Sequence, residues 1–167
     1  MKTSYYPEPN ELLSARGLDW GESKRMFKYN AELKKIATTK VPCPPASAID
    51  MDGPAWRWVT NPIEEACFDP VAIKNPPRLL RASGPAQECS CWGLSMHKSK
   101  AQSVTAFQDL EKTVRQARKL FGGHTSGATL TAAHGKGTNA SSSGHFDLHP
   151  LTKSDFLAVF VSCQVIP

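Results

Sequence analysis

The chain has 167 residues, 40% of them hydrophobic and 21% charged, so it is long enough for one well-packed core and has a globular composition. The net charge of +5 favours acidic partners mildly, but there is no dense basic stripe of a dedicated nucleic-acid-binding domain. No apolar run reaches the roughly 18 residues of a membrane span, and the first residues lack the apolar region of a signal peptide. We therefore expect a cytoplasmic protein without a membrane segment.

The cysteines are five in number, and their spacing is irregular (Cys43, Cys67, Cys89, Cys91 and Cys163). An odd number of scattered cysteines does not indicate a disulfide framework. Cys89 and Cys91 are separated by one residue, whereas zinc ligands are commonly separated by two to four. We expect reduced thiols, as in cytosolic proteins.

Residues 1–37 are predicted to form an N-terminal helical segment. The stretch "NELLSAR" favours a short helix ended by Gly17, and Asp19 can cap a second helix from Trp20 to about Ala37. The second helix places apolar residues on one face (Met26, Tyr29, Leu33 and Ile36). A short helix, a glycine turn and a basic helix have the outline of a helix-turn-helix, so nucleic-acid binding remains open. The commoner explanation is an exposed, charged helix face.

Residues 38–77 are predicted to form a proline-rich wrap or linker. Five prolines lie between positions 42 and 62, and proline fits neither a long helix nor a central strand. Trp56 and Trp58 alternate with Arg57, which indicates a short edge strand with both indoles on one face.

Residues 78–167 are predicted to form the α+β core. The stretches "RLLRAS" and "SCWGLSMH" favour two strands. A long amphipathic helix should follow from Ser99 to Phe121, capped by Ser99 with Gln102 and ended by glycines 122 and 123. The stretches "GATLTAA" and "HFDLHPL" favour two more strands, joined by the polar, flexible loop "HGKGTNASSSG". The expected fold is one α+β domain, with a mostly antiparallel sheet packed against one long amphipathic helix and an N-terminal helical segment.

Residues 124–150 contain four of the five histidines. Strand geometry places His145, Asp147 and His149 on one face, with Phe146 and Leu148 pointing into the core. Two histidines and a carboxylate suit a divalent metal. Strand residues two apart are separated by about 6.7 Å, so one ion would bind two of the three and take His134 or His124 as a further ligand. The alternative is a solvated strand face.

The loop around Lys136 resembles a phosphate-binding loop only in part. Leu130 stands where the Walker pattern needs a glycine, and the loop joins two strands instead of opening a helix. Backbone amides of a glycine-rich turn, together with Lys136, could still bind an anion. The alternative is a flexible hairpin tip.

The stretches "PRLLRAS" and "CWGLSMHKS", followed by a long helix, resemble the start of RES-type and related ADP-ribosyltransferase-like domains over about residues 78–121. The resemblance implies NAD binding, with an arginine on the first strand (Arg78 or Arg81) and Ser95 on the next. Such domains also carry an acidic residue late in the chain. After Glu111, only Asp147 and Asp155 remain for that role.

Besides nucleic-acid binding by the N-terminal helices, three functions follow from these patterns. The first is a noncatalytic binding or accessory domain, whose partner would be a protein or small molecule sooner than a nucleic acid. The second is an ADP-ribosyltransferase-like enzyme, which needs Arg78 or Arg81, Ser95 and an acid to converge on one cleft. The third is a metal-dependent enzyme, which needs His134, Asp147 and His145 or His149 within coordinating distance.

Overall fold

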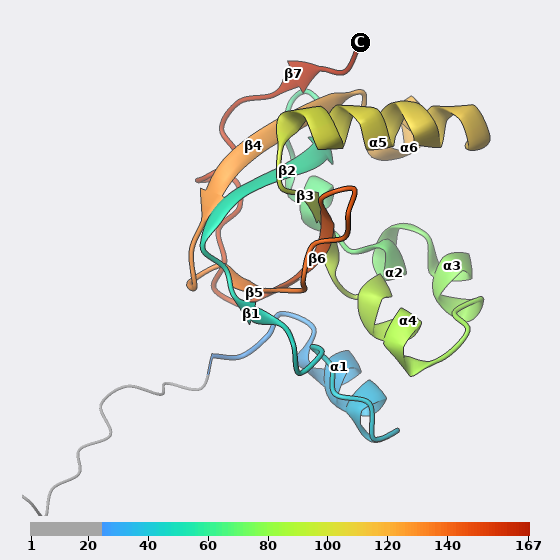
Figure 1. Cartoon of the computed structure of the whole chain (residues 1–167), viewed down its shortest axis with the longest axis vertical. Coiled ribbons are helices and arrows are strands. Elements are labelled where there is room, and N and C mark those ends of the chain that lie inside the picture. Colours follow the sequence, from blue (N-terminus) through green and yellow to red (C-terminus); the bar gives the residue numbers. More distant parts are fainter. Residues whose placement is uncertain (1–24) are drawn as a thin grey trace, which may run out of the picture.

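The computed structural model describes residues 25–167 as an α+β fold built on one seven-stranded sheet (Figure 1). The strand order is β1-β5-β6-β3-β2-β4-β7, and every neighbouring pair is antiparallel. The strands are β1 (Ile49–Asp50), β2 (Gly53–Val59), β3 (Leu94–His97), β4 (His124–Leu130), β5 (Gly135–Gly137), β6 (His145–Pro150) and β7 (Gln164–Val165). The predicted antiparallel α+β fold is confirmed.

The helices gather in three places around the sheet (Figure 1). They are α1 (Asn30–Ala37), the 3-10 turn η1 (Glu65–Phe68), α2 (Val71–Lys74), α3 (Pro76–Leu80), α4 (Pro85–Cys91), α5 (Lys100–Thr113) and α6 (Ala117–Phe121). Helix α5 packs on β2, β3 and β4, the short helices α2 to α4 form a second group, and α1 contacts α4. Among residues 25–167, no helix combines the length and apolar character needed to cross a membrane.

Much of the predicted N-terminal helical segment, including "NELLSAR", Gly17 and Asp19, lies outside the described residues. Within them, the helix predicted from Trp20 begins only at Asn30. Phe27 forms a β-bridge with Leu151, and this pairing keeps Phe27 itself out of the helix. Leu33 and Ile36 are buried as predicted, but Met26 is 55% exposed.

The proline-rich stretch supplies β2, which lies between β3 and β4 in the sheet. The prediction of an edge strand was wrong. Proline is tolerated because β3 pairs with β2 at Trp56 and His97 alone, so Pro54 has no partner on β3. Ala55, Arg57 and Val59 are buried, and the two tryptophans alternate with them.

The strand predicted from "RLLRAS" is wrong, because Pro76 and Pro77 open helix α3. Proline suits the first helical positions, where backbone N–H groups have no partner within the helix. Pro85 opens α4 in the same way. This helix takes up Cys89 and Cys91, so the next predicted strand shortens to β3.

The long helix begins as predicted and ends early. Ser99 Oγ accepts a hydrogen bond from the Gln102 amide at 3.3 Å, which confirms the cap. Helix α5 stops at Thr113, and Gln116 takes a left-handed conformation (φ 67°) before α6. Gly122 (φ 82°) then ends α6, where a side chain would meet the backbone of Val59.

The C-terminal half follows the predicted order of strands, with two differences. The polar loop after β4 contains β5, which pairs with β1 and β6, so it is not wholly irregular. The apolar C-terminal stretch packs Phe156 and Phe160 into the core, and its strand β7 is short and exposed. Phe146 and Leu148 of β6 point into the same core, as predicted.

The expectation of reduced thiols is wrong for one pair, because Cys43 and Cys89 form a disulfide. The bond joins the segment after α1 to helix α4 and spans 46 residues of sequence. Neither cysteine has a partner at a spacing that sequence rules recognise. Cys67, Cys91 and Cys163 are free.

Candidate functional site

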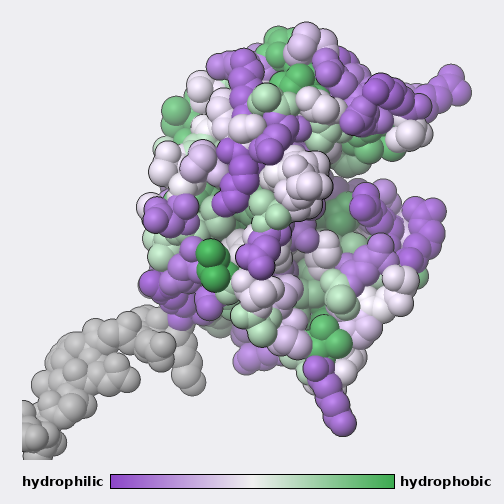
Figure 2. Space-filling model, in the orientation of Figure 1, coloured by the Kyte–Doolittle hydropathy of each residue, from purple (hydrophilic) through white to green (hydrophobic). Residues whose placement is uncertain are grey.

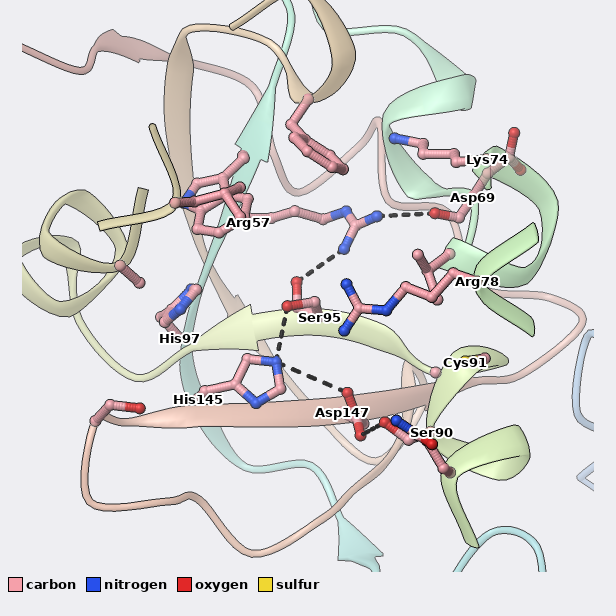
Figure 3. Close-up of a pocket in the computed structure, with 18 residues that line it drawn as sticks. Arg57, Asp69, Lys74, Arg78, Ser90, Cys91, Ser95, His97, His145 and Asp147 are labelled. Atoms are coloured by element: carbon pink, nitrogen blue, oxygen red, sulfur yellow. Dashed lines mark hydrogen bonds and ion pairs between the residues drawn. The ribbon is translucent and has the colours of Figure 1, made fainter. Parts of the chain in front are cut away.

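A pocket of about 430 Å³ opens between the α5–α6 side of the molecule and the α2–α4 side. Figure 2 shows the surface hollowed between these two parts. Strands β2, β3 and β6 contribute the polar side chains nearest its centre, drawn in Figure 3 (Arg57, Ser95, His97, His145 and Asp147). The volume lies within the range of pockets that bind small molecules.

Arg57 occupies the place where β2 and β3 separate. Because these strands pair only at Trp56 and His97, the guanidinium group enters the gap and donates to the Ser95 carbonyl at 2.8 Å. It also donates to the carbonyls of Cys67 at 2.6 Å and Asp69 at 2.9 Å. Burial lowers the pKa of Arg57 to about 10, so the group stays protonated at neutral pH. Three of its five N–H donors are thus engaged.

Ser95, His145 and Asp147 meet because β3 and β6 are neighbours. Ser95 lies opposite Asp147 in the strand register, and His97 lies opposite His145. Ser95 Oγ is 2.8 Å from His145 Nε2, and the same nitrogen is 3.8 Å from Asp147 Oδ1. In a Ser-His-Asp triad the carboxylate holds the other ring nitrogen. The arrangement is therefore not that triad.

Asp147 is held from the α4 side. Ser90 Oγ donates to its Oδ2 at 2.7 Å, and burial raises the pKa of the carboxyl group against the opposing effects of Ser90, His145 and Arg78. Gly93 allows this approach, since a Cβ there would lie 2.8 Å from the Asp147 Cβ. The turn between α4 and β3 therefore needs a glycine at this position.

Trp58 lines the pocket and packs against other aromatic rings beside α5. The Trp58 ring lies 5.4 Å from His97 and 5.2 Å from Phe107, and its Nε1 donates to the Ser103 carbonyl at 3.0 Å. His97 is 3% exposed, and its ring lies 5.5 Å from that of His145. Burial, with smaller effects of His145 and Arg57, lowers the pKa of His97 to about 4, so it is neutral at pH 7.

Two further cations line the pocket from the short helices. Lys74 of α2 is exposed as a whole residue, but its Nζ donates to the Cys67 carbonyl at 3.3 Å. Burial of the ammonium group, together with Arg57, lowers the pKa of Lys74 to about 8. Arg78 of α3 points toward β3 and β6 (Figure 3). The pocket thus combines three cations with the carboxylates of Asp69 and Asp147.

The residues predicted to hold a ligand separate into two groups. Arg78 and Ser95 line this pocket, although Arg78 comes from a helix and not from a strand. Arg81 is not among the lining residues, and Lys136 lies on β5 opposite His149.

The residues predicted to hold a metal are not gathered into one cluster in the described part of the chain. His145 and Asp147 face the pocket, whereas His134 Nδ1 accepts from the Thr131 amide at 3.0 Å. His149 is 1% exposed, and neither of its ring nitrogens has a hydrogen-bond partner in the part of the chain that the structure describes. One of its ring nitrogens lies within 4.8 Å of the Sγ atoms of Cys43 and Cys89.

Sequence reasoning missed Arg57, Asp69 and Lys74 as site residues. A charged residue alternating with tryptophans in a strand was a signal for Arg57, since such a residue must either face solvent or find buried partners. Asp69 follows the 3-10 turn η1 and Lys74 ends the short helix α2, and neither element carries a comparable pattern.

Comparison with known proteins identifies no relative of this chain. A scan against protein-family models found no match, and searches of curated proteins and of solved structures found no significant match.

Proposed function

We propose that the pocket binds NAD and that the protein is an ADP-ribosyltransferase-like enzyme. The observation that carries this proposal is the placement of Arg57, Ser95 and Asp147 on the neighbouring strands β2, β3 and β6 around one pocket. The resemblance in sequence calls for an arginine on one strand, a serine on the next and an acid late in the chain. Arg57 takes the strand position first expected for Arg78 or Arg81, and Arg78 lies across the pocket.

The charges of the pocket suit a dinucleotide. A pyrophosphate carries negative charge, and three cations (Arg57, Lys74 and Arg78) line the cavity. Arg57 is preorganised by three carbonyl groups and keeps two N–H donors for a ligand. Trp58 and Phe121 offer apolar surface for a planar ring.

The polar groups suit cleavage of an N-glycosidic bond. When the bond between nicotinamide and ribose breaks, neutral nicotinamide leaves with the bonding electrons and positive charge develops on the ribose. The Asp147 carboxylate would stabilise that charge. Water or an acceptor hydroxyl then forms the new bond to the ribose carbon, and its proton passes to His145 or to solvent.

Calorimetric titration of NAD into the full chain tests the binding step, with Arg78→Ala and Arg81→Ala as matched variants. Both arginines belong to the α3 region, but only Arg78 lines the pocket. We expect Arg78→Ala to weaken NAD binding about tenfold, as loss of a charged hydrogen bond does, and Arg81→Ala to leave it unchanged. Absence of NAD binding by the wild type, or equal losses in both variants, would overturn the proposal.

A second candidate is binding without catalysis, the function expected by default from the sequence. It is favoured by the engagement of the Asp147 carboxylate with Ser90 at 2.7 Å, which holds the acid in place without a ligand. Chromatographic measurement of nicotinamide release separates the two functions. Release above the rate of the Asp147→Asn variant supports the enzyme, and binding without release supports the noncatalytic domain.

The cytoplasmic location expected from the sequence stays a prediction, as does the preference for a small molecule or protein over nucleic acid. The Cys43–Cys89 disulfide is a kind of bond that persists mainly in oxidising compartments. Fractionation of cells that express the full chain would decide between the cytoplasm and an oxidising compartment.

A further inference from the structure

His149 is a buried side chain whose environment requires an explanation. It is 1% exposed, and neither Nδ1 nor Nε2 has a hydrogen-bond partner among residues 25–167. Buried polar atoms in native proteins are nearly always paired, and each exception calls for a physical reason. The residues around the imidazole therefore show what its nitrogens can bind.

Two cysteine sulfur atoms lie close enough to a ring nitrogen of His149 to bind one metal ion together with it. One ring nitrogen of His149 and the Sγ atoms of Cys43 and Cys89 all lie within 4.8 Å of one another. The three residues come from separate elements: His149 from β6, Cys89 from α4, and Cys43 from the segment after α1. Cys89 is buried as deeply as His149, and Cys43 is half-buried, which leaves a route for an ion from solvent.

Two sulfurs and one imidazole nitrogen form a ligand set typical of zinc. Zinc accepts thiolates at about 2.3 Å and histidine nitrogen at about 2.0–2.1 Å, in a tetrahedron whose fourth ligand can be water. Atoms within 4.8 Å of one another can reach such positions with small side-chain rotations. Soft thiolate ligands select zinc over magnesium or calcium.

We propose that Cys43, Cys89 and His149 form a zinc site when the Cys43–Cys89 disulfide is reduced. A dithiol supplies two electrons and two protons, the disulfide becomes two thiols, and the dithiol becomes a disulfide. Binding of Zn²⁺ then releases two protons as both thiols become thiolates, and the neutral His149 donates its lone pair. The disulfide joins the segment after α1 to helix α4, whereas zinc would join both of them to β6 as well.

The site uses two elements that also line the pocket, α4 and β6, and it does not depend on the proposed function. Ser90 follows Cys89 on α4, Asp147 precedes His149 by two residues on β6, and Ser90 donates to Asp147 at 2.7 Å. A metal bound between α4 and β6 would therefore fix the two elements that carry this hydrogen bond.

Elemental analysis of the full chain, reduced with a phosphine and then incubated with Zn²⁺ and desalted, tests the proposal. We expect one zinc per reduced chain, none per oxidised chain, and loss of zinc in Cys43→Ser, Cys89→Ser and His149→Leu. Cys163→Ser is the matched control, because Cys163 is free and outside the cluster, and it should retain zinc. With Co²⁺ in place of zinc, the reduced protein should show the visible absorption of tetrahedral thiolate coordination.

Absence of zinc in the reduced wild type would overturn the proposal, and so would full retention in His149→Leu. Equal loss in Cys163→Ser would also overturn it. A second measurement on the wild type needs no variant to fold. Zinc should protect Cys43 and Cys89 from alkylation, as mapped by mass spectrometry, and should leave Cys163 reactive; alkylation of all three at equal rates in the presence of zinc contradicts the site.

Discussion

The two ends of β6 place two histidines in opposite environments. His145 faces the pocket and bonds Ser95 at 2.8 Å, with 40% of its side chain exposed. His149, four residues along the strand, is 1% exposed, and its ring nitrogens have no hydrogen-bond partner within the described residues. The same strand face therefore contributes one histidine to an open polar pocket and another to a closed group of sulfur atoms.

This difference shows that the alternating pattern of a strand predicts which side chains share one face. It does not predict which residues from other elements pack against that face. Opposite His145 lies β3, which offers a hydroxyl group and a neighbouring cavity. His149 instead meets Cys43 and Cys89, which lie more than 50 residues earlier in the chain. Long-range packing decides which of the two histidines reaches solvent.

Replacement of Asp147 should have the largest effect at the part of β6 that lines the pocket. Asp147→Asn keeps an acceptor for Ser90 but removes the charge, so we expect NAD cleavage to fall about 100-fold with a smaller change in NAD affinity. Nicotinamide release in a single-turnover assay measures the effect. Asp155→Asn is the control, because Asp155, the other late acid, only caps the Ala158 amide. Equal losses in both variants would contradict the role of Asp147.

Acid unfolding tests the contribution of His97, which is buried beside His145. The pKa of His97 is about 4 in the folded protein and 6.5 when unperturbed, so the unfolded chain binds more protons between these values. Stability present above pH 6.5 should fall by up to about 3 kcal/mol as the pH drops to 4. Urea unfolding of the wild type and His97→Leu over this range measures it. Parallel pH profiles for the two proteins would show that His97 does not contribute.

Matched leucine substitutions compare the two ends directly. His149→Leu removes two unpaired buried nitrogens at similar volume, so with the disulfide intact we expect unfolding free energy to rise by about 1 kcal/mol. His145→Leu removes the Ser95 hydrogen bond, so we expect a decrease of about 1 kcal/mol. Urea unfolding at pH 7 measures both. Changes of the same sign would show that the two environments do not differ as described.

The pH dependence of NAD binding is the smallest of these effects. Lys74 has a pKa of about 8, and an anionic ligand favours its protonated form. We therefore expect NAD affinity to decrease about fivefold as the pH rises through 8, because a partly exposed charge contributes up to about 1 kcal/mol. Lys74→Arg should remain charged and remove most of this dependence in calorimetric titrations. An unchanged profile in Lys74→Arg would assign the effect to another group.

The sequence predicts elements whose signals are local. The Ser99 cap, the core-facing Phe146 and Leu148, and the Gly122 helix end depend on residues a few positions apart, and the structure confirms them. The prolines led to the wrong prediction that β2 is an edge strand, because Pro54 lies where β3 does not pair with β2. They also misled the prediction at Pro76, which opens a helix instead of preceding a strand.

The candidate site was predictable only in part. Ser95 and Asp147 follow from strand patterns and from the resemblance, but Arg57 was predicted on an edge strand without a role in the site, and Arg78 was predicted on a strand. The position of Arg57 depends on the separation of β2 and β3, and the Cys43–Cys89 bond joins positions 46 residues apart. Neither feature has a signature within any short window of sequence.

Titration of isotopically labelled full chain with NAD, followed by NMR, tests the central claim most directly. If NAD occupies the pocket, backbone amide shifts should concentrate at Ser90, Ser95, His145 and Asp147. The amides of Lys136 on β5 and Gln164 on β7 should stay unchanged. Shifts confined to β5 or β7, or none at saturating NAD, would contradict the assignment of this pocket.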